Sequence, residues 1–115
     1  MIPSRLKISE AATTRLRYIK SKTGMTPNIT CRIALALSIR EMRKVYRQNG
    51  DSSGQEFNAP TLFGDHQRAY ELVLEKYIAE TGDDREISEI ICSHIDNGLH
   101  KLGHVKSLTD LASVG

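Results

Sequence analysis

A central buried helix is predicted by residues 26–37, which read TPNITCRIALAL. Thr26 suits the N-cap of a helix, and Pro27 is preorganised for the first helical position. From Ile29 to Leu37 the stretch is apolar on nearly all sides, as in a helix that lies in a core or in a subunit contact. We therefore expect a central helix that begins at Pro27 and continues to about Arg47.

The residues before this helix predict a strand and another helix. Basic and apolar residues alternate over Arg5–Ser9, as in a short half-buried strand. Ser9 can then cap a helix that ends at Gly24. The apolar stripe of this helix consists of Ala12, Leu16 and Ile19.

The second half of the chain predicts a loop, an extended segment and two long helices. Residues 49–54 read NGDSSG, which is typical of a surface loop. Residues 56–64 have no helical period but contain both Phe residues, so we expect an extended segment anchored by these rings. Asp65 is expected to cap a helix over 66–80, and a further helix should cover 84–102. The residues expected to face inward are Ala69, Leu72, Val73 and Tyr77 or Ile78 on the first of these helices, and Ile87, Ile90, Ile91, Ile95, Leu99 and Leu102 on the second.

Two smaller signals complete the predicted fold. Gly98 interrupts the last long helix and allows another helix to pack closely there. Ser107 and Asp110 resemble a capping box and predict a short terminal helix. The predicted class is mainly α: a compact helical domain of about four to five helices, with a short N-terminal strand and one extended segment around 56–64. At 115 residues we expect a single domain over 1–115.

The composition excludes several classes of protein. With 39% hydrophobic residues, 26% charged residues and no Trp, the chain fits a soluble protein with an aliphatic core. Its longest apolar run, Ile33–Leu37, is far shorter than the roughly 20 residues of a membrane-spanning helix. The first residues lack the apolar stretch of a signal peptide. We expect a cytoplasmic protein in which Cys31 and Cys92 are reduced.

Charge is divided unevenly along the chain. Residues 1–50 contain eleven Lys or Arg and two acids, a net charge of +9, whereas residues 51–115 contain five bases and twelve acids, a net charge of −7. Such clustered bases indicate a surface for a polyanion, and the acidic helical part over 55–115 indicates a protein partner or solubility. Because few aromatic residues lie among the bases, we expect contacts with the backbone of duplex DNA and not stacking on single strands.

No catalytic constellation stands out in the sequence. The glycines form neither of the common phosphate-binding loops. His100 and His104, with His94 nearby, could share a helix face, but Gly103 intervenes and no acid or Cys completes a metal site. Cys31 lies among aliphatic residues, which raise the pKa of a thiol. We expect no catalytic residue, no metal and no cofactor.

Three other functions stay open on the sequence. The strand-helix-helix order of the first 47 residues also fits a ribbon-helix-helix transcriptional regulator, in which a paired strand reads the major groove of a specific operator. A nicking or sulfur-transfer enzyme would need a metal or an activated nucleophile such as Cys31. A scaffold that contacts only protein would not bind DNA.

Six short motifs together resemble a known family. They are TGMTPNI (23–29), CRIA (31–34), EFN (56–58), TLFG (61–64), SHIDNG (93–98) and VKSL (105–108). In this order, over nearly the whole chain, they are similar to DndE, the small subunit of the bacterial DNA phosphorothioation system. The resemblance implies a mainly helical protein that forms a tetramer and binds double-stranded DNA, with a preference for nicked duplex. It also implies three partners that replace a non-bridging phosphate oxygen by sulfur: a cysteine desulfurase, an iron-sulfur protein and an ATPase.

The resemblance also implies where DNA binds. The family uses surface lysines of the first helical region, which match Arg17, Lys20 and Lys22 here. Together with the charge analysis, this predicts DNA contacts from Arg15, Arg17, Lys20, Lys22, Arg40, Arg43, Lys44 and Arg47. The chain would then be a non-catalytic subunit that positions DNA for its partners, while Ile29–Leu37 and the later helices build the oligomer.

Overall fold

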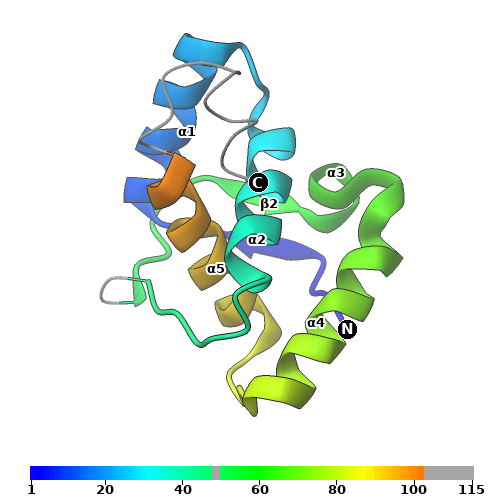
Figure 1. The fold of residues 1–115 in the computed structure, drawn as a ribbon. Helices are drawn as coiled ribbons and strands as arrows, with labels where there is room; N and C mark the ends of the chain where they lie inside the picture. Colours follow the sequence, from blue (N-terminus) through cyan, green and yellow to red (C-terminus); the bar gives the residue numbers. More distant parts are fainter. Residues whose placement is uncertain (48–49, 103–115) are drawn as a thin grey trace.

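The computed structural model describes residues 1–47 and 50–102. In chain order they form β1 (Arg5–Lys7), α1 (Glu10–Thr23), α2 (Pro27–Ile39), β2 (Glu56–Asn58), α3 (Ala59–Phe63), the 3₁₀ turn η2 (Gly64–His66), α4 (Gln67–Thr81) and α5 (Ile87–Leu102). Figure 1 shows α2 near the centre, with α1 and α4 on opposite sides of it. The predicted mainly α class with a short N-terminal strand is confirmed. No helix in the described ranges is long and apolar enough to cross a membrane.

Helices α2 and α5 pack directly on one another and contribute much of the core. Gly98 of α5 permits this contact, because a Cβ atom at that position would overlap backbone atoms of Ala34 on α2. Cys31, Ala34 and Leu35 of α2 are buried. The sequence therefore predicted correctly that the helix beginning at Pro27 is central and that Gly98 allows close packing.

Helix α2 ends at Ile39 and not near Arg47, so the predicted end of this helix is wrong. Met42 has a positive φ of 52°, which is unusual for a residue with a side chain, and the chain turns there. Beyond the turn Val45 is buried, and Arg47 hydrogen-bonds to β1 and α5. These contacts draw the chain away from the helix axis, so the bases from Arg40 onward lie on an irregular segment.

The N-terminal strand and the first helix form as predicted. Strand β1 pairs antiparallel with β2, with Leu6 opposite Phe57, and both of these side chains are buried. The Ser9 hydroxyl oxygen accepts a hydrogen bond from the Ala12 N–H and caps α1. Gly24 ends α1 with a φ of 77°, a conformation that glycine adopts without strain.

The segment 56–64 is extended only in β2. After β2 the Asn58 side chain accepts a hydrogen bond from the Thr61 N–H, and Pro60 lies in the first turn of α3. The prediction of an extended chain is therefore wrong for residues 59–63, because a capping residue and a proline start a helix there. The rings of Phe57 and Phe63 are buried, as expected of anchors.

Helix α4 buries Tyr77, as predicted, but not the other residues that were expected to face inward. Leu74 and Tyr77 are buried, whereas Leu72 and Val73 are 51% and 40% exposed and Ala69 is exposed as well. Apolar residues occur around most of α4, except on the side that carries Arg68, Glu71 and Glu75, so periodicity alone does not select its buried face. The hydrogen bond from the Tyr77 hydroxyl to Asp83 favours the observed rotation.

The starts of α4 and α5 differ from the predicted ones. Helix α4 follows the 3₁₀ turn η2 without a side-chain cap from Asp65. Helix α5 begins at Ile87, because Asp83 and Arg85 bind one another in the loop before it. Its predicted core residues Ile90, Ile91, Ile95, Leu99 and Leu102 are buried, and Ile87 is partly buried. The predicted terminal helix at 107–110 lies outside the described residues.

Candidate nucleic-acid interface

The bases of α1 lie on its outer surface. Leu16 and Ile19 are buried, which turns the opposite face of the helix to solvent. Because successive helical residues are rotated by about 100°, one flank of this face carries Arg15 and Lys22 and the other carries Arg17 and Lys20. Arg17, Lys20 and Lys22 are exposed, and Arg15 is half-buried. Helix α1 therefore presents positive charge on both flanks.

The exposed bases of α1 are not neutralised by acids. Among residues 1–47 and 50–102, none of the ion pairs includes Arg17, Lys20 or Lys22. The Lys22 Nζ atom lies 5.7 Å from the ring centroid of Tyr18, which is itself 48% exposed. A phosphate group can therefore approach these three cations without displacing a carboxylate.

Arg15 lies in a more mixed environment, beside a polar cleft of about 790 Å³. The cleft is lined by Ser9, Ala11, Arg15, Tyr46, Asp51, Asp96, Asn97 and His100. The Ser9 hydroxyl donates a 2.6 Å hydrogen bond to Asp96, and the two aspartates would repel a phosphate. This places Arg15 at the border of the positive surface.

The second predicted cluster, residues 40–47, is spread along an irregular segment. Arg40, Arg43 and Lys44 are exposed. The Arg43 Nε atom lies 3.5 Å from one carboxylate oxygen of Glu41, and the other oxygen pairs with Lys101. The cluster is therefore less concentrated than the helical spacing predicted.

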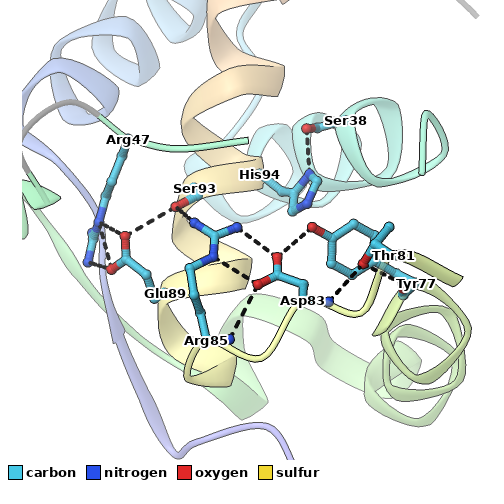
Figure 2. A network of polar contacts seen from close by, with 9 residues as sticks. All are labelled: Ser38, Arg47, Tyr77, Thr81, Asp83, Arg85, Glu89, Ser93 and His94. Carbon is cyan, nitrogen blue, oxygen red and sulfur yellow. Dashed lines mark hydrogen bonds and ion pairs between the residues drawn. The ribbon is translucent and has the colours of Figure 1, made fainter. Parts of the chain in front are cut away.

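Arg47 belongs to the interior of the protein. Its side chain is only 8% exposed. The guanidinium group donates to both carboxylate oxygens of Glu89, at 3.2 Å from Nε and 2.7 Å from Nη2, and to the Lys7 carbonyl oxygen at 2.9 Å. Figure 2 shows this bidentate contact. Arg47 therefore ties the irregular segment to β1 and α5.

A chain of polar contacts continues from Glu89 into the core, as Figure 2 shows. The Ser93 hydroxyl donates to Glu89 at 3.2 Å and accepts from Arg85 at 3.5 Å. Arg85 holds both oxygens of Asp83, at 2.9 and 2.7 Å, and the Tyr77 hydroxyl donates to Asp83 at 2.6 Å. The Arg85 guanidinium keeps the pKa of Asp83 well below its usual value, and burial raises that of Tyr77 to about 12.

His94 is a hydrogen-bonded histidine of the core. It is fully buried, its Nδ1 atom lies 2.7 Å from the Ser38 hydroxyl oxygen, and its ring meets that of Tyr77 edge-on at 4.7 Å. The Ser38 oxygen also accepts a 2.9 Å hydrogen bond from the Asn97 side-chain amide, and the tautomer of the His94 ring sets which partner donates in the Ser38–His94 contact. Burial lowers the pKa of His94 to about 4, with Arg85 adding to the shift.

The sequence did not single out these polar contacts. Ser38 and His94 lie 56 residues apart and show no shared spacing. The only local signal was Asp83 and Arg85 flanking one residue of a short loop. His100 is exposed, and His104 lies outside the described residues, so the three histidines are not shown together. No cluster of three potential metal ligands occurs in the described ranges.

Both cysteines are free and buried. Burial raises the pKa of Cys31 to about 12 and that of Cys92 to about 11. Both thiols therefore stay protonated at neutral pH, and the predicted effect of the aliphatic surroundings on Cys31 is borne out.

Comparison with known proteins identifies the family. The family model for the DNA sulphur modification protein DndE matches residues 5–110. This chain belongs to the DndE family. A solved structure of DndE from Escherichia coli B7A, involved in DNA phosphorothioation modification, is 26% identical with a TM-score of 0.71, over 86% of this chain and 97% of that one. No curated protein sequence matches the chain.

A second solved structure shares the DndE fold. It is a glycine-to-lysine double mutant of DndE involved in DNA phosphorothioation, and it is 23% identical with a TM-score of 0.68. The alignment covers 88% of this chain and 97% of that one. The family predicted from the short motifs is therefore confirmed.

The DndE motifs lie mainly at positions that determine packing. Residues 23–29 form the turn from α1 into α2 and include the left-handed Gly24. The SHIDNG motif on α5 places His94 and Gly98 against α2. The last motif, at 105–108, lies outside the described residues. In this DndE chain the motifs therefore stabilise the fold, whereas the exposed bases lie on the surface of α1.

Proposed function

We propose that this chain binds double-stranded DNA through the phosphate backbone and presents it to the proteins that carry out phosphorothioation. The single observation that supports this most is the exposed positive charge of Arg17, Lys20 and Lys22 along α1, which forms no ion pair within residues 1–47 and 50–102. The DndE family takes part in a reaction that modifies DNA phosphate groups. Lys and Arg side chains that bind phosphates release the condensed counterions of DNA, and this release supplies affinity for DNA.

The proposed surface has α1 at its centre. Arg15 lies at its border with the polar cleft, and Arg40, Arg43 and Lys44 supply further phosphate contacts from the irregular segment. We assign Arg47 a structural role, because Glu89 and a backbone carbonyl already occupy its guanidinium group. Removing Arg47 would deprive the partly buried Glu89 carboxylate of the cation that pairs with it.

Binding is proposed to tolerate sequence and to favour a nicked duplex. Phosphate contacts position a protein on DNA but do not read its bases. The cations of α1 lie on two flanks of the helix. A duplex that bends can therefore contact more of these cations than a stiff duplex can. A nick lowers the cost of bending, which gives a physical reason for the preference that the family resemblance implies.

The chain is proposed to be an accessory subunit that forms a homotetramer. The cysteine desulfurase, the iron-sulfur protein and the ATPase of the system would perform the chemistry. The buried, protonated thiols of Cys31 and Cys92 support this division, because neither is suited to carry sulfur. Cys31, Ala34 and Leu35 are covered within one chain, so the subunit contacts would use other residues than these.

A ribbon-helix-helix regulator is less well supported by the geometry. In such a dimer the strand pairs with the same strand of a second subunit and reads the major groove. Here β1 pairs with β2 of its own chain, and Arg5 on its outer side lies 3.1 Å from Glu56. One edge of the strand is therefore already paired inside the protomer.

Fluorescence anisotropy with intact, nicked and single-stranded oligonucleotides of unrelated sequence, at low and high salt, tests the proposal. Combining Lys20→Glu with Lys22→Glu is expected to weaken duplex binding about tenfold or more and to reduce the salt slope by about two. The matched control is Arg68→Glu, which reverses an exposed base on α4 and should change affinity by less than about twofold.

The binding measurements distinguish DNA binding through α1 from a role in protein binding and from a sequence-specific regulator. Unchanged affinity in the double variant, with its thermal melting preserved, would exclude α1 as the DNA surface. Absence of binding by the unmodified chain at low salt would mean that the basic half serves a protein partner. A strong preference for one sequence would favour the regulator.

A further inference from the structure

An apolar groove lies between α2 and α4. Two adjoining cavities of about 620 and 420 Å³ share Ala36, Arg40, His66 and Tyr70 as walls. Together they form one depression, which we call the α2–α4 groove. Figure 1 shows α4 on the opposite side of α2 from α1, so the groove is separate from the α1 part of the proposed DNA surface and shares only Arg40 with that surface.

The floor of the α2–α4 groove is apolar and open to solvent. Helix α2 contributes Ile29, Ile33 and Ala36, whose spacing of four and then three residues forms a single stripe. Helix α4 contributes Ala69 and Val73, also four residues apart. Ile29 and Val73 are 45% and 40% exposed. The sequence predicts that Ala69 and Val73 face the core, yet nothing in the described chain covers these two side chains.

The edges of the groove are basic. The charged side chains that line it are Arg32, Arg40 and Lys76, with the titratable His66 beside them. Across the described ranges, no Asp or Glu is part of this lining. Lys76 lies 3.8 Å from Glu80, but both side chains are at least half exposed, so this pair leaves most of the positive potential in place.

We propose that the α2–α4 groove binds an amphipathic helix of a partner protein, with apolar residues on the floor and acidic residues against the basic edges. Helices that bind in grooves use apolar anchors at spacings of three and four residues, which the stripe on α2 matches. The basic edges complement acidic flanks and repel basic ones. This partner site is additional to the DNA-binding function proposed above.

The other occupants fit the groove less well. A two-fold contact between two copies would place the same patch of both chains face to face. Arg32, Arg40 and Lys76 of each copy would then oppose their own kind, which disfavours the contact. The DNA backbone has no apolar surface to cover Ile29 and Val73, whereas an amphipathic helix does.

The test uses the full chain and two synthetic helical peptides with identical apolar positions, one flanked by Glu and the other by Lys. By fluorescence anisotropy, the Glu peptide is expected to bind about tenfold more tightly, with the difference shrinking at high salt. Val73→Glu should weaken this binding about tenfold or more. Leu72→Glu makes the same change on the next residue, which is exposed but outside the lining, and should alter it less than about twofold.

Several outcomes would overturn the proposal. These are no binding of either peptide, equal binding of both, or equal losses in the Val73→Glu and Leu72→Glu variants. A changed oligomeric state of Val73→Glu in size-exclusion chromatography with light scattering would assign the groove to a second copy. Displacement of the Glu peptide by duplex DNA would assign it to DNA. Unchanged DNA affinity of Val73→Glu would keep the two sites distinct.

Discussion

His94 makes the stability of this protein depend on pH. Its pKa is about 4 in the folded chain, against 6.5 for an ordinary histidine, because burial disfavours the imidazolium. Below pH 6.5 the unfolded chain therefore binds a proton at His94 that the folded chain does not, and stability falls until the pH reaches the folded pKa. We expect a loss of about 2 kcal/mol between pH 7 and pH 5.

Urea denaturation at a series of pH values measures this loss. His94→Gln is expected to be less stable at pH 7 but to lack most of the slope between pH 6.5 and pH 5. Asp83 does not interfere, because its folded pKa is depressed and its contribution is lost only well below this window. A free energy of unfolding of the unmodified chain that stays constant from pH 7 to pH 5 would contradict the prediction.

At the scale of single residues, the sequence predicted the charge of each side chain but not always whether that side chain lies on the surface or in the interior. The sequence grouped Arg47 with the neighbouring bases as a DNA contact. Its hydrogen bonds to Glu89 and to the Lys7 carbonyl oxygen instead place it in the interior. Lys20 and Lys22 have the exposure that helical periodicity predicts. The difference arises because contacts between residues about 40 positions apart leave no local signal.

At the scale of elements, local signals predicted the ends of α1, α4 and α5 and the starts of α1 and α2, but not the end of α2. Ser9 and Pro27 open α1 and α2 as predicted, whereas Asn58 and Pro60 open α3, which the sequence analysis expected to be extended chain. The end of α2 depends on burial of Val45 and on the turn at Met42, neither of which the sequence marks with glycine or proline. The sequence likewise did not determine the buried face of α4, because apolar residues occur around most of that helix.

Gly98 is expected to tolerate no side chain. Gly98→Ala should lower the free energy of unfolding by about 3 kcal/mol, although alanine favours a helix by about 1 kcal/mol over glycine. The added Cβ atom would meet backbone atoms of Ala34, so a rotamer change cannot relieve the overlap. Chemical denaturation measures this change.

Two variants act as controls for this prediction. Ser88→Ala, at a half-buried position of the same helix, should change stability by less than about 1 kcal/mol. Ala34→Gly should fail to rescue Gly98→Ala, because it removes a side chain and not the backbone that obstructs. A Gly98→Ala variant as stable as the unmodified chain would show that α2 and α5 separate easily.

At the scale of the whole molecule, two surfaces of different chemistry lie on opposite sides of α2. Helix α1 carries exposed bases, and the α2–α4 groove combines an apolar floor with basic edges. The two proposals together describe a subunit that holds DNA with one side and a partner protein with the other. This arrangement would bring the duplex to the proteins that modify it.

The two sites are expected to be occupied at the same time. Duplex affinity, measured in the presence of saturating Glu peptide, should stay within about twofold of its value without peptide, because the two proposed surfaces share only Arg40. Titrating labelled duplex into the chain with and without the peptide measures this. A rise of about tenfold in the dissociation constant would show that the two ligands compete for one surface.

The sequence by itself determined the helical class, the starts of α1 and α2, the close contact at Gly98 and the family, because each depends on residues near one another or on an ordered set of motifs. The tertiary structure alone decided the end of α2, the rotation of α4, the interior role of Arg47 and the buried neutral state of His94. Each of these follows from a contact between distant parts of the chain, whose free energy outweighs the local preference.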